Sequence, residues 1–118
     1  MTNTPSILVV EDEPFVSDHL EALLKDNGAE TTACQTAADA LKTLAAKSFD
    51  AAILDVHLSD NASYPVADEL RRRGTPFVFL SGYLTIREGY ADIPFLEKPF
   101  TPETVETALA SMLKPRAA

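Results

Sequence analysis

Apolar residues along the chain gather in short runs whose lengths suit β-strands. Four runs are apolar throughout most of their length and show no alternation with polar residues: 6–10, 50–54, 76–80 and 93–96. Strands of this kind are typical of a parallel sheet that is covered on both faces. A more polar run, ETTAC at 30–34, fits a strand at the edge of such a sheet.

Helical spacing of apolar residues separates these runs. After Pro14, four apolar residues share one helical face until Gly28 ends the pattern: Val16, Leu20, Leu23 and Leu24. Thr36 is placed to cap a second helix, and Pro65 to open a third that ends at Gly74.

The last helix is expected to begin at Thr101 and Pro102, with an apolar face behind them. The segment 81–92 has two glycines and no clear apolar stripe, so a helix there is expected to be short or mobile. Strand and helix thus alternate along the chain. This order predicts a single α/β domain over residues 1–118, with a parallel sheet and helices on both of its faces.

Composition excludes several classes of function. The chain has 118 residues, enough for one domain with a real core, and a net charge of −8. That charge disfavours nucleic-acid binding, which needs a basic surface. No apolar run approaches the ~20 residues that cross a bilayer, and the single cysteine, Cys34, cannot form an internal disulfide. We therefore expect a cytoplasmic protein that contacts neither nucleic acid nor membrane.

Polar side chains follow four of the five predicted strands at the point where each strand ends. Glu11 and Asp12 follow the first, Asp55 the third, Ser81 the fourth and Lys98 the fifth. In an open parallel sheet the carboxyl ends of the strands meet at one edge, where ligands bind. We expect these five side chains to lie close together.

Carboxylates gathered at one edge repel one another unless a cation neutralises them. Mg²⁺ fits oxygen ligands best here, because it usually takes one or two carboxylates together with waters and phosphate oxygens. A lysine and a hydroxyl beside it suit a phosphoryl group. Each residue alone has an ordinary structural explanation as a helix cap, turn former or surface charge, but their conjunction favours phosphoryl transfer.

The chain resembles the receiver domain of bacterial response regulators in two-component systems along essentially its whole length. The matching stretches are ILVVEDEP with Glu11 and Asp12, AILDV with Asp55, FLSG with Ser81, and LEKPF with Lys98. The stretch PFVFLSGY further resembles a stand-alone subgroup with a Pro-Phe-x-Phe-Ala-Thr-Gly-Tyr-like signature, in which Leu80 and Ser81 replace Ala and Thr.

The resemblance implies a flavodoxin-like (βα)5 fold with strand order 2-1-3-4-5. Asp55 would accept a phosphoryl group from a sensor histidine kinase or a phosphotransfer protein, and Ser81 and Lys98 would hold its oxygens. Glu11, Asp12, Asp55 and the backbone carbonyl of His57 would bind Mg²⁺, Glu11 through water. The Lys98–Pro99 peptide bond would be cis.

Three residues are candidates for a switch or gate. Phe95 stands three places before Lys98, where receivers usually carry an aromatic switch residue, although a plain core phenylalanine fits as well. His57 and Tyr83 stand two places after Asp55 and Ser81, where side chains control water access to the phosphoryl group. We expect bulky residues at both places to slow hydrolysis.

The chain departs from the common receiver pattern at two places. Its first acid is Glu11 where many receivers have Asp, and HLSDNASYP after Asp55 lacks the usual Met-Pro-Gly run.

Without an output domain in this sequence, output is expected through a downstream protein target or phosphate shuttling, from a monomer or weak dimer. Two alternatives are a small-molecule phosphatase that forms an aspartyl phosphate and a degenerate receiver that only binds a partner. A receiver would promote only its own phosphorylation and dephosphorylation.

Overall fold

The computed structural model describes residues 4–56, 58, 63–81, 90 and 92–113, and in them five parallel strands form one sheet in the order β2-β1-β3-β4-β5. The strands are β1 (Ser6–Val10), β2 (Glu30–Cys34), β3 (Ala51–Asp55), β4 (Phe77–Ser81) and β5 (Phe95–Glu97). The helices are α1 (Pro14–Asp26), α2 (Ala37–Ala46), α3 (Ser63–Arg73) and α4 (Pro102–Leu113). The predicted α/β fold and strand order are confirmed.

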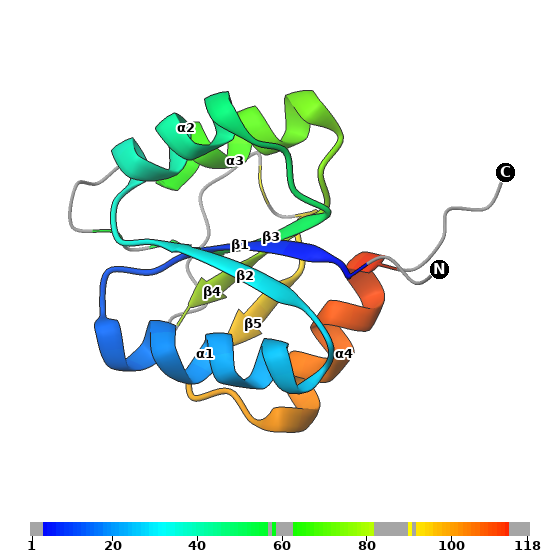
Figure 1. Cartoon of the computed structure of the whole chain (residues 1–118). Coiled ribbons are helices and arrows are strands. Elements are labelled where there is room, and N and C mark those ends of the chain that lie inside the picture. Colours follow the sequence, from blue (N-terminus) through cyan, green and yellow to red (C-terminus); the bar gives the residue numbers. More distant parts are fainter. Residues whose placement is uncertain (1–3, 57, 59–62, 82–89, 91, 114–118) are drawn as a thin grey trace, which may run out of the picture.

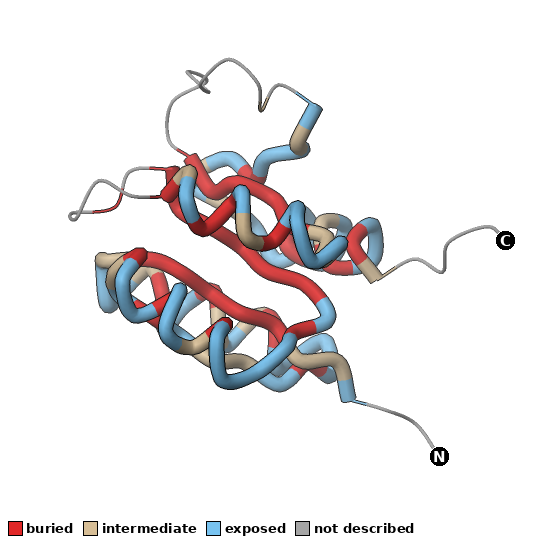
Figure 2. Tube along the Cα trace, turned by 90° about the horizontal axis from the view of Figure 1, so that it is seen from above, coloured by how far each residue is buried: buried red, intermediate tan, exposed pale blue. Residues whose placement is uncertain are grey.

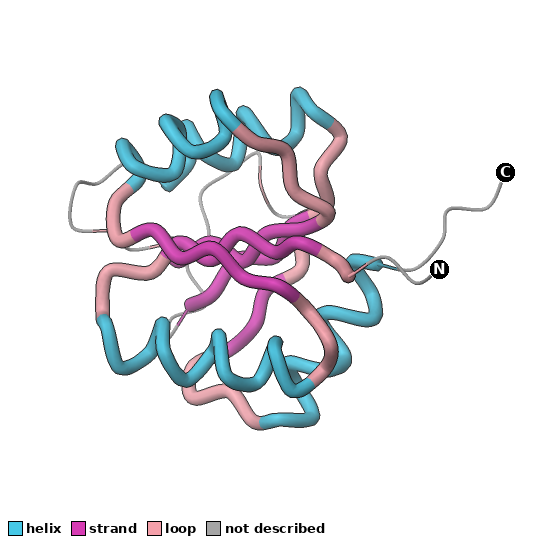
Figure 3. Tube along the Cα trace, in the orientation of Figure 1, coloured by secondary structure: helices cyan, strands magenta, loops and turns pink. Residues whose placement is uncertain are grey.

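The helices form two layers, one on each face of the sheet. In Figure 1, α2 and α3 lie above the sheet and α1 and α4 lie below it. Figure 3 shows the same three layers, with the strands in magenta between helices in cyan. Within the described ranges, no helix is long and apolar enough to cross a membrane.

Both faces of the central strands are buried, which explains why their sequences do not alternate. In β1, Leu8 and Val10 belong to the core cluster under α2 and α3, whereas Ile7 and Val9 belong to the cluster under α1 and α4. All four are 0% exposed. Figure 2 shows these strands as continuous buried segments between helices whose outer faces are exposed.

The strand ends differ by one or two residues from those predicted. The runs 50–54 and 76–80 form strands one residue later, because pairing continues through Asp55 with Leu80 and through Ser81 with Glu97. The run 93–96 forms a shorter strand, Phe95–Glu97. Asp55 and Ser81 are therefore the last residues of strands rather than the first residues of loops.

The predicted start of the third helix was wrong by two residues. Helix α3 begins at Ser63, and the Ser63 hydroxyl donates a 2.6 Å hydrogen bond to the carbonyl of Val56. Pro65 fits inside the first turn because the N–H that it lacks has no helical partner there. The helix anchors the chain just after Asp55.

The other helix boundaries follow the predicted signals. Thr36 caps α2 through its hydroxyl, which accepts a 3.1 Å bond from the Asp39 N–H. The Thr101 hydroxyl accepts a 3.2 Å bond from the Thr104 N–H at the start of α4. Gly28, which follows α1, has φ of +85°, a conformation that favours glycine. The predicted short or mobile fourth helix falls mainly on 82–89 and 91, which lie outside the described residues.

Replacing a buried leucine of α2 tests how much the core cluster under α2 and α3 contributes to stability. Leu44 is 1% exposed and Leu41, on the same helix, is 36% exposed. We expect Leu44→Ala to lower the free energy of unfolding by about 2–5 kcal/mol, because it leaves a cavity. Leu41→Ala should lower it by less than about 1 kcal/mol. Urea denaturation measures both, and equal losses would contradict the assigned core.

Candidate functional site

Three carboxylates lie together at the carboxyl edge of the sheet. Glu11 follows β1, Asp55 ends β3, and Val10 pairs with Leu54 in the register of these neighbouring strands. Glu11 and Asp55, which come directly after this pair in the chain, therefore lie side by side. One carboxylate oxygen from each of Glu11, Asp12 and Asp55 lies within 4.8 Å of the others.

Two of these acids are buried almost completely. Glu11 is 0% exposed and Asp55 is 2% exposed, whereas Asp12 is partly exposed. Their side chains follow the alternation of β1 and β3 toward the face covered by α1 and α4, where Ile7, Val9 and Ile53 lie. Apolar packing against this face thus positions two acids that would otherwise prefer water.

Lys98 supplies a cation to the acid cluster. Its Nζ lies 2.9 Å from Glu11 Oε1 and 3.2 Å from Asp55 Oδ2. The Lys98 N–H donates a 2.9 Å hydrogen bond to the carbonyl of Ser81, which ties the residue after β5 to the end of β4. The Lys98–Pro99 peptide bond is cis, as the resemblance implied.

Ser81 reaches the same edge of the sheet from β4. It is 1% exposed and lies between the ends of β3 and β5, because β4 pairs with both strands. The structure therefore brings together all five polar residues that the sequence placed at strand ends. The His57 carbonyl, predicted as a further ligand, and the predicted gates His57 and Tyr83 lie outside the described residues.

Burial and crowding change the pKa values in the cluster. Burial raises the pKa of the Glu11 carboxyl, and Asp55 raises it further, against hydrogen bonds from the Glu13 N–H and Lys98. Burial, with Glu11 beside it, also raises the pKa of Asp12. For Lys98, burial lowers the pKa, but Glu11 and Asp55 outweigh burial and the net shift is upward. The single positive charge of Lys98 thus does not neutralise the three carboxylates.

The donor set fits a hard divalent cation. Glu11 Oε2 accepts a 3.0 Å bond from the Glu13 N–H. Glu11 Oε1 is buried, and its cationic neighbour is Lys98 Nζ at 2.9 Å. One ammonium serves three carboxylates here, and a bound cation would add the positive charge that they lack. Glu11, Asp12 and Asp55 are the residues that could hold the ion.

Two contributors to the site were missed by the sequence reasoning. The Glu13 backbone N–H orients the Glu11 carboxylate, and the Ser63 hydroxyl holds the Val56 carbonyl beside Asp55. No residue-type signal could have revealed the first, because any residue except proline offers that N–H. A serine eight residues after an acceptor acid gives no specific signal either.

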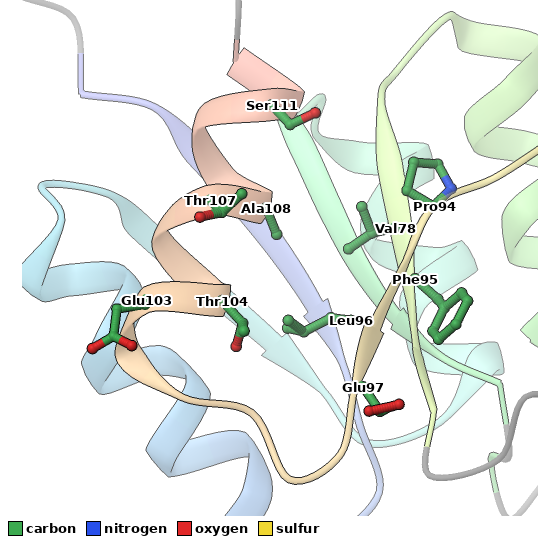
Figure 4. Close-up of a pocket in the computed structure, with 10 residues that line it drawn as sticks. All are labelled: Val78, Pro94, Phe95, Leu96, Glu97, Glu103, Thr104, Thr107, Ala108 and Ser111. Atoms are coloured by element: carbon green, nitrogen blue, oxygen red, sulfur yellow. The ribbon is translucent and has the colours of Figure 1, made fainter.

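Phe95 is not a core residue. It is 42% exposed on β5, so the plain core interpretation is wrong, whereas its role as a switch remains a prediction. It lines a cavity of about 440 Å³ between β5 and α4. Figure 4 shows this cavity, with Val78, Leu96 and Ala108 forming its apolar wall. No residue of the acid cluster lines it.

The chain belongs to the family of response regulator receiver domains, whose model matches residues 7–110. An NtrX-like response regulator of Rickettsia bellii (strain RML369-C) is 31% identical over 103 residues, 80% of this chain and 22% of that protein. The solution structure of SdrG from Sphingomonas melonis Fr1 is 39% identical with a TM-score of 0.84, over 96% of this chain and 99% of that one.

A structure of the PhyR stress response regulator is 29% identical with a TM-score of 0.83, over 98% of this chain and 48% of that one. The chain spans half or less of the length of the curated relatives that it matches. The comparisons establish a receiver domain homologous to response regulators. Receiver domains are phosphoacceptor switches rather than enzymes that turn over a separate substrate.

Removing the Lys98 ammonium tests its coupling to the acids. We expect Lys98→Met to lower the free energy of unfolding by about 1–2 kcal/mol, because Glu11 and Asp55 lose their cation. In the background of Asp55→Asn the loss should shrink by more than about 0.5 kcal/mol. Chemical denaturation without divalent ions measures the cycle. Lys42→Met, at an exposed lysine of α2, is the control, and additive effects of Lys98→Met and Asp55→Asn would contradict the coupling.

Proposed function

We infer that this chain is a phosphoacceptor switch in which Asp55 receives a phosphoryl group in a Mg²⁺-dependent reaction. One observation carries the proposal: Asp55, two further carboxylates and the Lys98 ammonium meet at one edge of the sheet. The donor is a phosphohistidine of a sensor histidine kinase or a phosphotransfer protein, as in the family to which the chain belongs.

The reaction is a transfer between two nucleophiles. A carboxylate oxygen of Asp55 forms a bond to phosphorus while the bond from phosphorus to the donor imidazole nitrogen breaks, and its electron pair stays on the imidazole. Lys98 Nζ, 3.2 Å from Asp55 Oδ2, is placed to neutralise charge on the transferred group. The Ser81 hydroxyl donates to another phosphoryl oxygen.

Glu11, through water, and Asp12 and Asp55 directly would hold Mg²⁺, with the His57 carbonyl as the further ligand that the family resemblance implies. The ion would supply a Lewis acid that neutralises phosphoryl oxygens. The protein holds the carboxylates in fixed positions, because β1 and β3 are packed on both faces and keep Asp55 at the site.

The phosphodonor approaches over an apolar surface beside Lys98. A cavity of about 470 Å³ there is lined by Phe15, Val16, His19, Lys98, Pro99 and Phe100. Phe15, in the first turn of α1, is 90% exposed. A large exposed aromatic next to the acceptor suits contact with a protein donor better than a small-molecule substrate. This observation disfavours the small-molecule phosphatase.

The switch acts on a downstream protein target through the surface that contains Phe95, or passes its phosphoryl group onward. Phe95 and several apolar side chains line the cavity between β5 and α4 (Figure 4). A conformational change that starts at Asp55 would alter this surface and with it the contact to a partner protein. The degenerate receiver alternative would require loss of an acid, the acceptor or the lysine, and all are present.

Phosphorylation with a small phosphodonor tests the acceptor. With acetyl phosphate and Mg²⁺ we expect the chain to gain one hydroxylamine-labile phosphate per molecule, because the proposal assigns a single acceptor, Asp55, beside Lys98. Asp55→Asn should abolish the gain, and Asp26→Asn, an exposed acid at the end of α1, should retain it. Intact-mass spectrometry gives the stoichiometry, and unchanged labelling of Asp55→Asn would refute the proposal.

Addition of Mg²⁺ tests the ion site independently of phosphorylation. We expect it to raise Tm, and at ten times Kd to add about 1.4 kcal/mol to the free energy of unfolding, because the ion binds only the folded chain. Asp12→Asn should remove most of the effect, whereas Asp26→Asn should leave it unchanged. Circular dichroism melting measures both. Equal stabilisation of wild type and Asp12→Asn would place the ion elsewhere.

A further inference from the structure

Ser63 lies where a side chain outside the acid cluster can hold the end of β3. It is the first residue of α3 and is 2% exposed. Its hydroxyl donates a buried 2.6 Å hydrogen bond to the carbonyl of Val56, the residue that directly follows Asp55. The bond therefore joins the start of a helix to the backbone beside the proposed acceptor.

Both backbone groups of Val56 are held by hydrogen bonds. The Val56 N–H donates a 3.1 Å bond to the Leu80 carbonyl of β4, and the Val56 carbonyl accepts the bond from Ser63. The first bond continues the pairing of β3 with β4 one residue past Asp55, whereas the second comes from the helix layer. The backbone just after Asp55 is thus fixed by β4 and α3 together.

The start of α3 is a firm attachment point for this bond. On the buried face of the helix, Val66 and Leu70 are 0% exposed and belong to the core cluster under α2 and α3. The ring of Tyr64, next to Ser63, packs on Phe79 of β4 with 5.8 Å between the ring centroids. Because the helix is packed closely against the sheet, the Ser63 hydroxyl holds its acceptor from a fixed position.

Local sequence does not restrict the backbone at Val56. Residues 56–63 read VHLSDNAS and contain no proline. A proline would fix a backbone angle through its ring and lower the entropy that folding costs. The conformation of Val56 in the folded chain therefore depends on tertiary contacts, and the buried bond from Ser63 is one of them.

We propose that Ser63 is a positioning residue for Mg²⁺, which acts through the Val56 carbonyl to keep Asp55 in place for the ion. This inference rests on the function proposed above, in which Asp55 is a direct ligand. The hydroxyl orders the end of β3 before the ion arrives. Without it, part of the free energy of ion binding would be used to order the strand end, and the affinity for Mg²⁺ would fall.

A positioning role changes the affinity for Mg²⁺ more than the rate of phosphoryl transfer. At saturating Mg²⁺ the bound ion itself orders Asp55, so the rate recovers. A contribution of Ser63 to global stability alone would change neither quantity, because the variant remains folded in the assay. The two roles are therefore distinguished by measuring affinity and maximal rate separately.

The first test is a titration of the ¹⁵N-labelled chain with MgCl₂, followed by NMR at Glu11, Asp12 and Val56. We expect Ser63→Ala to raise the Kd about threefold to tenfold, which corresponds to the net loss of one buried hydrogen bond. Alanine preserves the start of α3, because it is the best helix former. In buffer without divalent ions, the Val56 N–H should exchange with solvent about threefold to tenfold faster in the variant, because the strand end opens more often.

The second test is the rate of phosphorylation by acetyl phosphate as a function of Mg²⁺ concentration. In Ser63→Ala the concentration that gives half of the maximal rate should rise by the same factor as the Kd. The maximal rate at saturating Mg²⁺ should change by less than about twofold. An unchanged Kd, or a lower maximal rate at an unchanged Kd, would overturn the positioning role.

Thr31→Val is the matched control for the loss of a hydroxyl. The Thr31 hydroxyl also donates a 2.6 Å bond, to Glu21 Oε2, but Thr31 pairs with Ile7, toward the amino end of β1 and away from the acids. Its replacement should leave the Kd for Mg²⁺ unchanged, and a rise equal to that in Ser63→Ala would also overturn the proposal. Failure of the wild type to gain phosphate would refute the acceptor role of Asp55 instead, because the titration and the exchange measurement need no phosphorylation.

Discussion

The structure depends on keeping buried carboxylates next to one another at the end of a parallel sheet. Ionised Glu11 and Asp55 repel each other, and burial adds to the cost of charging Glu11. Lys98 relieves part of this cost through contacts of 2.9 and 3.2 Å. A cation held by Glu11, Asp12 and Asp55, as proposed above, would relieve the remainder.

The sheet can tolerate this charge because it is packed on both faces. Residues of β1 alternate between the two core clusters, and β3 does the same with Ala52 and Leu54 on one side and Ala51 and Ile53 on the other. Neither strand can shift by one residue without moving an apolar side chain to the wrong layer. The register between them places Glu11 beside Asp55 and keeps both acids in position.

Sequence reasoning predicted the fold, and it predicted that five polar residues would meet at one edge of the sheet, because both depend on local patterns. Apolar runs without alternation predicted buried parallel strands, and polar residues at strand ends predicted Glu11, Asp12, Asp55, Ser81 and Lys98. It failed where tertiary contacts decide. The start of α3 depends on the bond from Ser63 to the Val56 carbonyl, and Phe95 is 42% exposed although Leu96, its neighbour on β5, is buried. Neither feature has a signature in local sequence.

The central claim is that the whole arrangement serves one acceptor, Asp55. Borohydride reduction of the phosphorylated chain, followed by peptide mapping, tests this most directly, because it converts a phosphorylated aspartate into homoserine. The account predicts homoserine at position 55 alone, and only when Mg²⁺ was present during phosphorylation. Homoserine at another aspartate, or none at position 55 in a chain that has gained phosphate, would contradict it.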